Sequence, residues 1–518
     1  MPAGESRPKT VNGGFHSHDG HDMYGPWRHH PIRRGTGMAE FLSNRWRGEG
    51  GYRELLFMAF PLVLTTSSWS IQHFVDRMFL AWYSPEAIAA AMPSGILNYT
   101  IMSLFIGAVS YVNTFVAQYH GAKRFDRIGP ALWQGIYLSF IGGIFILCLI
   151  PLAGPIFAFV GHDPAVRENE VVYFQYLCLG GVPVIAASAL AGFFSGRGRP
   201  WPVMWVNVLA TAVNIILDYL LIFGKWGFAE MGMKGAAIAT VISGVFSFFA
   251  YVVLIARPSY DGIYCTLSGW RPDRELFVRL LKFGVPAGVQ FFLDMAGFTI
   301  FVLILGRLGT VSLAATNIAF NINTLAFMPM IGTGIAVSVL VGQYLGKDRP
   351  DLAVRSTYSG FGMTFIYMST VAVLFVMVPT FFVAPFVAQA HSKAYSDISR
   401  ISIILLRFVA LYSVFDTMNV IFASAIKGAG DTRFVMYMNV LVSAFVLVIP
   451  TYTAIMVFGY GLMAAWSLAT AYVILLGFAF FGRFLQGRWK SMRVIEEPYA
   501  IRAIPPVCSE CPDVKFEP

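Results

Sequence analysis

Long apolar segments recur along almost the whole chain and constrain its fold more than any other feature. Each has about 20 residues or more, enough for a helix to cross a hydrocarbon core about 30 Å thick. Only 13% of the 518 residues are charged and 57% are hydrophobic, whereas about 25% of the residues in a soluble domain are charged. The sequence therefore predicts an all-α polytopic membrane protein.

Twelve membrane-spanning helices are predicted, at residues 55–82, 91–118, 131–153, 170–192, 203–224, 233–256, 276–305, 313–342, 354–384, 401–424, 435–458 and 461–485. An even number of spans puts both termini on one side, and most of the 37 Lys and Arg lie on that side. The positive-inside rule identifies it as the cytoplasm. We expect a multi-pass protein of the cell (inner or plasma) membrane with cytoplasmic termini. The net charge of +9 then reports topology, and no nucleic-acid partner is expected.

The second half of the chain repeats the first. The pattern Gln-Tyr-x-Gly-x-x-Arg-x-Asp at 118–126 returns at 343–351, and Gly-x-Gly followed by Val-Met-x-x-Asn-Val at 196–208 returns at 428–440. Each half holds six spans, so the halves are parallel repeats, which are typical of transporters that rock two lobes about a central site. The expected parts are a polar tail, an N-terminal lobe, a cytoplasmic linker, a C-terminal lobe and a second tail, at 1–54, 55–256, 257–279, 280–485 and 486–518.

Four carboxylates lie inside the apolar segments, namely Asp76, Asp218, Asp294 and Asp416. Each costs roughly 2.5–3.5 kcal/mol at the centre of a membrane helix. Together they cost about as much as the net stability of an ordinary domain, about 5–15 kcal/mol. Such residues are typical of ion sites, proton relays and substrate pathways. The structural alternatives are a helix-end ion pair between Asp76 and Arg77, and a counter-charge for Asp416 from Arg407, which could instead extend outward.

Asn214 lies four residues before Asp218, so their side chains share one helix face. Carboxylates and an amide oxygen suit a hard cation or protons, and close carboxylates that repel each other can keep a proton near neutral pH. His73, one turn before Asp76, could relay protons, although contact with lipid headgroups or a neighbouring helix is the simpler interpretation.

Several motifs are distributed over both halves. They are Pro61 with Val75-Asp76, Val116-Ala117-Gln118-x-x-Gly121, Asn214-x-x-x-Asp218, Gly235-Ala236-Ala237-x-Ala239-Thr240 and Lys427-Gly428-x-Gly430. In combination they resemble the multidrug and toxic compound extrusion (MATE) transporters over roughly residues 50–485. The sequence departs from that family at Ala81-Trp82-Tyr83-Ser84, which replaces a glycine-rich turn in a loop.

The resemblance implies two six-helix lobes around a central cavity and export of organic, often cationic, compounds coupled to Na⁺ or H⁺. It places one cation or proton site at Asp76, Asn214, Asp218 and Thr240. A second, matching the NorM-type branch, falls at Asp294, Tyr412 and Asp416. Pro61 is a candidate hinge, since proline bends helices. The expected partners are small organic cations or drugs and membrane lipid, for a monomer with no cofactor and no metal beyond Na⁺.

Other functions stay open at this point. A flippase for lipid-linked precursors, from the same superfamily, would need a basic cavity, and a passive channel would not explain acids divided between two lobes. No H-E-x-x-H, G-x-S-x-G in a strand context or P-loop is present, so an enzyme is not expected. The histidines at 16, 18, 21, 29 and 30 and the pair Cys508-x-x-Cys511 could bind a metal, but polar tails are the simpler interpretation.

Overall fold

The computed structural model describes residues 45–160, 163–387 and 393–496, and all regular structure in these ranges is helical. Eleven of the described helical segments are long and apolar enough to cross a membrane, and one bent pair gives a twelfth if it is counted as a single span. The prediction of an all-α polytopic membrane fold is confirmed.

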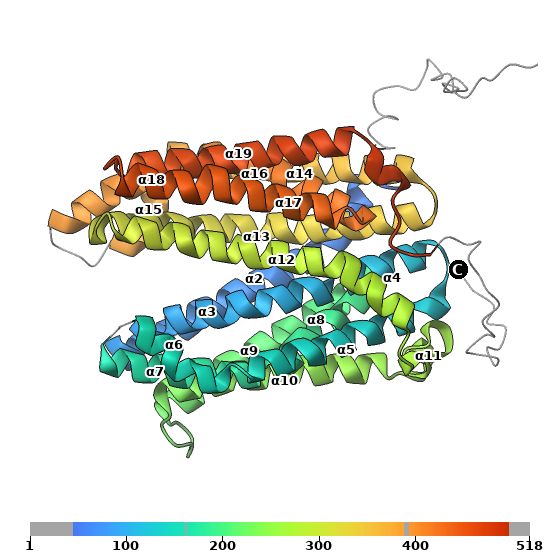
Figure 1. Cartoon of the computed structure of the whole chain (residues 1–518), viewed down its shortest axis with the longest axis horizontal. Helices are drawn as coiled ribbons and strands as arrows, with labels where there is room; N and C mark the ends of the chain where they lie inside the picture. Colours follow the sequence, from blue (N-terminus) through green and yellow to red (C-terminus); the bar gives the residue numbers. More distant parts are fainter. Residues whose placement is uncertain (1–44, 161–162, 388–392, 497–518) are drawn as a thin grey trace, which may run out of the picture. The chain divides into compact units, whose positions relative to one another are not determined.

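The helices of the first half are α2 (Tyr52–Tyr83), α3 (Pro85–Ser110), α4 (Val112–Gly121), α5 (Ile128–Leu147), α6 (Ala153–Val160), α7 (Pro164–Leu179), α8 (Gly181–Gly196), α9 (Trp201–Phe223) and α10 (Gly232–Ile255). After the connecting helix α11 (Pro258–Tyr264), the second half contains α12 (Arg274–Gly306), α13 (Thr310–Gly346), α14 (Pro350–Met377), α15 (Pro379–Val387), α16 (Lys393–Ala429), α17 (Thr432–Val442), α18 (Ile449–Met456) and α19 (Leu462–Leu485). In Figure 1 the blue-to-green helices and the yellow-to-red helices form two groups, as the repeat predicts.

The predicted fourth span, 170–192, is the bent pair. Helices α7 and α8 meet at Gly180 with a bend of 47°. Two adjacent glycines, Gly180 and Gly181, with Pro183 close behind, account for the bend, because glycine pairs and proline both weaken a helix. The predicted eleventh span is also irregular, since a π-helical stretch, Ser443–Val448, separates α17 from α18. Pro183 and Pro450 therefore lie in the first turns of α8 and α18.

The first helix of each half is shared with the other half. Leu55 and Leu62, early in α2, are buried among second-half residues, whereas Phe79, near the end of α2, is buried in the first half. Helix α12 does the reverse, because Leu280 is buried among first-half residues and Leu305 among second-half residues. Accordingly α2 packs against α13, and α12 packs against α3. Each half thus completes the apolar core of the other.

The halves also meet where the repeated Gln-Tyr-x-Gly motif ends α4 and α13. The side-chain amide of Gln118 donates to the carbonyl oxygen of Gly428 at 3.1 Å, and that of Gln343 donates to the carbonyl oxygen of Gly196 at 2.8 Å. These bonds are equivalent under the repeat, which pairs Gln118 with Gln343 and Gly196 with Gly428. We call this meeting point the Gln–Gly contact.

Two glycines allow the backbones to approach at the Gln–Gly contact. A Cβ atom on Gly121 would lie 2.0 Å from the carbonyl oxygen of Gln343, and one on Gly346 would lie 2.2 Å from that of Gln118. Only glycine fits such an approach. Basic loops surround this part of the molecule, with Lys, Arg or both at 123–127, 197–199, 271–274 and 347–349. We call it the basic end.

Candidate functional site

Two of the predicted acids meet in the first half. Asp76 comes from α2 and Asp218 from α9, which pack against each other, and the two residues are only 6% and 0% exposed. Their carboxyl groups are close enough to hydrogen-bond to each other. That bond requires a proton on one of them, because two carboxylates offer only acceptors. With both ionised, Asp76 Oδ1 and both Asp218 oxygens lack a donor among the described residues.

The other predicted residues of this site lie on α9 and α10. Asn214, one turn before Asp218, is completely buried, and neither its Oδ1 nor its Nδ2 has a hydrogen-bond partner in the part of the chain that the structure describes. Thr240 lies on α10, which packs against α9. The Thr240 hydroxyl donates to the carbonyl of Ala236 at 3.0 Å, so its lone pairs stay free to accept. Among the described residues no hydrogen bond joins Thr240 to the acids.

The surroundings of this acid pair are apolar. Phe79, Ile222 and Met233 belong to the buried cluster near it, and Tyr173 of α7 interacts electrostatically with both acids. Buried polar atoms without partners are rare in folded proteins and point to a bound water, ion or proton. Arg77 is exposed and forms no ion pair with Asp76 within the described ranges; like His73, it interacts with Asp76 only electrostatically at longer range.

The second-half acids have hydrogen-bond donors. Asp294 of α12 and Asp416 of α16 interact electrostatically with each other. The amide of Gln290 donates to Asp294 Oδ2 at 3.4 Å, and that of Asn419 donates to Asp416 Oδ1 at 2.9 Å. Tyr412, one turn before Asp416, is 7% exposed and also interacts with that acid. This pair therefore holds negative charge more easily than the pair in the first half.

Several residues near the acids were missed by the sequence argument. Lys427 of α16 lies close enough to Asp294 to interact with it electrostatically, whereas Arg407 is exposed. Gln290 and Asn419 could have been found, since they lie one helical turn from Asp294 and Asp416. Tyr472 of α19, which interacts with both second-half acids, comes from a distant segment with no local signal.

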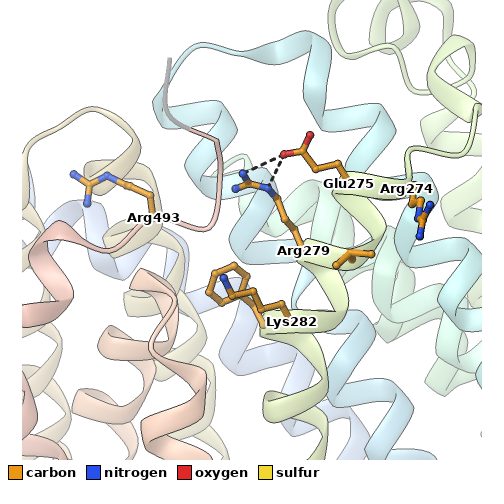
Figure 2. A pocket seen from close by; sticks show the side chains of 7 residues that line it. Arg274, Glu275, Arg279, Lys282 and Arg493 are labelled. Atoms are coloured by element: carbon orange, nitrogen blue, oxygen red, sulfur yellow. Dashed lines mark hydrogen bonds and ion pairs between the residues drawn. The ribbon is translucent and has the colours of Figure 1, made fainter. Parts of the chain in front are cut away.

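Two surface pockets lie at the basic end, and none of the four acids lines either of them. One, of about 630 Å³, is lined mainly by Arg274, Glu275, Arg279, Lys282 and Arg493 (Figure 2). The other, of about 870 Å³, includes residues of α2 with Arg197, Trp201 and Gln343. Within the described ranges no group of three or more His, Cys, Asp or Glu is placed to hold a metal ion. The histidine-rich segment and the Cys508–Cys511 pair lie outside the described residues.

Pro61, the candidate hinge, lies inside α2 and is buried. The hydroxyl of Thr65 donates to the Pro61 carbonyl at 2.9 Å. Gly332 of α13 faces Val63, two residues after Pro61, since a Cβ on Gly332 would lie 2.7 Å from the Val63 nitrogen. Pro61 is thus beside a close contact between the halves, and its role as a hinge stays a prediction.

Comparisons with known proteins agree with this architecture. The family model described as MatE matches residues 61–220 and 286–453, one segment in each half. The probable multidrug resistance protein NorM of Brucella suis is 26% identical over 400 residues, which covers 76% of this chain and 83% of the relative. The Pseudomonas aeruginosa protein of the same name is 27% identical over 463 residues, covering 87% and 92%. A solved structure, described as the outward-facing conformation of a multidrug resistance MATE family transporter of the MOP superfamily, aligns with a TM-score of 0.77 at 20% identity over 87% of this chain and 98% of that one.

Proposed function

Because this chain belongs to the MATE family of multidrug efflux transporters, we propose that it exports lipophilic organic cations in exchange for Na⁺ or H⁺. The observation that supports the proposal is the buried pair of Asp76 and Asp218, three of whose four oxygens lack a donor among the described residues. Burying a charge without a partner is expensive, so the pair needs a cation or a proton whenever the site is closed. A cation that enters from one side and leaves to the other would couple the site to an ion gradient.

Competition between the driving ion and the drug gives the exchange its direction. A ligand shifts a conformational equilibrium only by its difference in affinity for the two states. We propose that a proton or Na⁺ at the acids favours one orientation of the halves and that an organic cation favours the other. Asp294, Asp416 and Tyr412 would form the second cation site, with Lys427 providing a competing positive charge near Asp294.

The orientation follows from the positive-inside rule. We propose that the basic end, with both termini, faces the cytoplasm. The Gln–Gly contact then closes the cytoplasmic side, and transport requires that contact to break in each cycle. The rival function, lipid-precursor flipping, is disfavoured by the acids, since a lipid phosphate would need a basic interior.

The first test is a transport assay in reconstituted vesicles with a fluorescent lipophilic cation. When a Na⁺ gradient and a pH gradient are imposed one at a time, one of the two should accelerate export severalfold and the other should not, because only the coupling ion exchanges at the acids. Collapsing both gradients should stop net export. Undiminished export after both have collapsed would rule out antiport and favour a passive route.

A second test concerns the second-half site. Asp416→Asn should reduce export to background, because the amide keeps the shape of the side chain but cannot bind Na⁺ as an anion or carry the proton. The matched control is Asp351→Asn, since Asp351 is exposed and its ion pair among the described residues is with Arg349 of its own half. Normal export by the Asp416 variant would remove this residue from the proposed site.

A further inference from the structure

A short segment at residues 487–496 crosses from one half to the other at the basic end. It follows α19 and contains one turn of 3₁₀-helix, Arg488–Ser491. Figure 1 shows this red segment running from the end of α19 toward α4 of the first half. We call it the strap.

The beginning of the strap is fixed to the second half. Trp489 is fully buried, and its ring stacks on that of Phe484 with centroids 4.9 Å apart. The Trp489 Nε1 also donates to the Phe484 carbonyl at 2.9 Å. Further along, Arg493 forms an ion pair with Asp348 at 3.0 Å. These contacts make the first part of the strap a continuation of the second-half core.

The end of the strap is fixed to the first half. The Glu496 carboxylate accepts hydrogen bonds from the Tyr119 hydroxyl and from Arg127, each at 2.8 Å, and Arg124 Nη1 lies 3.3 Å from it. The Val494 N–H donates to Gln118 Oε1 at 2.8 Å. Gln118 is the residue whose amide nitrogen reaches Gly428, so the strap holds one side of the Gln–Gly contact directly.

The repeat shows what the strap replaces. Tyr119 corresponds to Tyr344, whose hydroxyl donates to Glu54 of α2 at 2.6 Å. The second-half residue corresponding to Glu54 is Arg279, which cannot accept this bond. Glu496 therefore gives Tyr119 the carboxylate that α12 does not provide at the position equivalent to Glu54. Each half of the Gln–Gly contact then has a tyrosine held by an acid, one from α2 and one from the strap.

We propose that the strap is a lock, which holds the two halves together at the basic end and must detach from the first half before that end can open. The proposal rests on the exchange of states described under Proposed function, and it assigns the release step to the contacts of Glu496 and Val494. Arg493 lies across the pocket from Arg274, with Arg279 and Lys282 between them (Figure 2). Arg279 donates to the Val494 carbonyl at 3.4 Å and pairs with Glu275, and Arg493 pairs with Asp348, so the charges around this pocket are partly compensated.

The test compares full-length Glu496→Gln with Asp351→Asn, the same chemical change at an exposed site that does not bridge the halves. Spin labels at Lys123→Cys and Lys347→Cys, in a background with the native cysteines replaced by serine, report the separation of α4 and α13 in purified protein without substrate or gradient. Because charge-assisted hydrogen bonds are about twice as strong as neutral ones, Glu496→Gln should raise the ratio of open to closed basic ends by about tenfold. Asp351→Asn should leave the ratio unchanged.

A second readout is hydrogen exchange of the Val494 amide, which should accelerate in Glu496→Gln and in Tyr119→Phe. An unchanged distance distribution overturns the lock, whether or not the exchange accelerates, because a strap that detaches without opening the basic end is not a lock. Neither the label distances nor the amide exchange requires transport. If the protein shows both expected responses but exports no dye, the result therefore counts against the transport proposal alone.

The lock should not respond to physiological pH. Burial by itself would raise the pKa of the Glu496 carboxyl, but hydrogen bonds from its own backbone N–H, Arg127 and Tyr119 outweigh it and lower the pKa to about 2, from an ordinary 4.5. A depressed pKa stabilises the locked state fully above pH 4.5, and this contribution is lost as the pH falls toward 2. The facing charges are Arg124 and Arg127, with Asp273 bonded to Arg127. The label distances should therefore be constant from about pH 6 to about pH 8, and a closed fraction that changes over this range would contradict the assignment.

Discussion

Asp218→Asn is expected to abolish export of lipophilic cations while the protein remains folded in the membrane. Both Asp218 oxygens are buried without a donor among the described residues, and a hydrogen bond with Asp76 would require a proton on one of the two acids. An asparagine amide would donate to Asp76 permanently, so the site could no longer exchange a cation or a proton. Replacing a buried ionisable group with a neutral amide also removes the desolvation cost of its charged form. The thermal unfolding temperature should thus equal or exceed that of the unchanged protein.

The measurement pairs an export assay in vesicles with thermal unfolding in detergent. Asp351→Asn is again the control, because it makes the same change at an exposed position. The informative combination is lost export with retained stability, which separates a coupling role from a packing role. Export at a normal rate would remove the first-half acid pair from the mechanism, whereas lost export with a strongly lowered unfolding temperature would favour a structural role.

Gly121→Ala should prevent the basic end from closing as it does here. The added Cβ would lie 2.0 Å from the Gln343 carbonyl oxygen, and backbone on both sides leaves no flexible side chain to move aside. Overpacking of this kind typically costs about 1–3 kcal/mol, which changes the ratio of closed to open states roughly 5- to 150-fold. We expect export to fall steeply and the labels at 123 and 347 to move apart.

Gly346→Ala should act in the same way, because its Cβ would lie 2.2 Å from the Gln118 carbonyl oxygen. The matched control is Gly482→Ala in α19, where an added Cβ meets nothing within 4 Å. Since alanine favours helices over glycine by about 1 kcal/mol, the control should be neutral or slightly stabilising. Unaltered distances in Gly121→Ala would show that the close approach is not needed for closure.

Much of the fold could be predicted because it follows from local properties of the sequence. Apolar length defines the spans, and the duplicated motifs define two halves. The bend at Gly180 could also have been anticipated from the adjacent glycines and Pro183. Which helices would be shared between the halves could not, because α2 and α12 change partners along their length and nothing in their own apolar pattern marks the change.

The candidate acids were found one by one, but the repeat does not say which of them meet. The position corresponding to Asp76 in the second half is Phe301, and the one corresponding to Asp416 in the first half is Val184. The acids therefore do not share the symmetry of the scaffold, and their pairing depends on which helices become neighbours. The strap has no periodic pattern or motif, and its contacts with the first half join residues more than 300 positions apart in the chain, so local reasoning had nothing to detect.

The sharing of α2 and α12 has a consequence for how such a molecule can arise. A single half would expose the apolar residues at the beginning of its first helix, such as Leu55 or Leu280, which are buried only by the other half. A half-length ancestor would thus have needed a second copy of itself, exchanging first helices across a twofold axis, before gene fusion joined the copies. Fusion then freed the two subunits to diverge: Tyr344 of the second half is held by Glu54 of α2, whereas Tyr119 of the first half is held by Glu496, an acid from beyond α19.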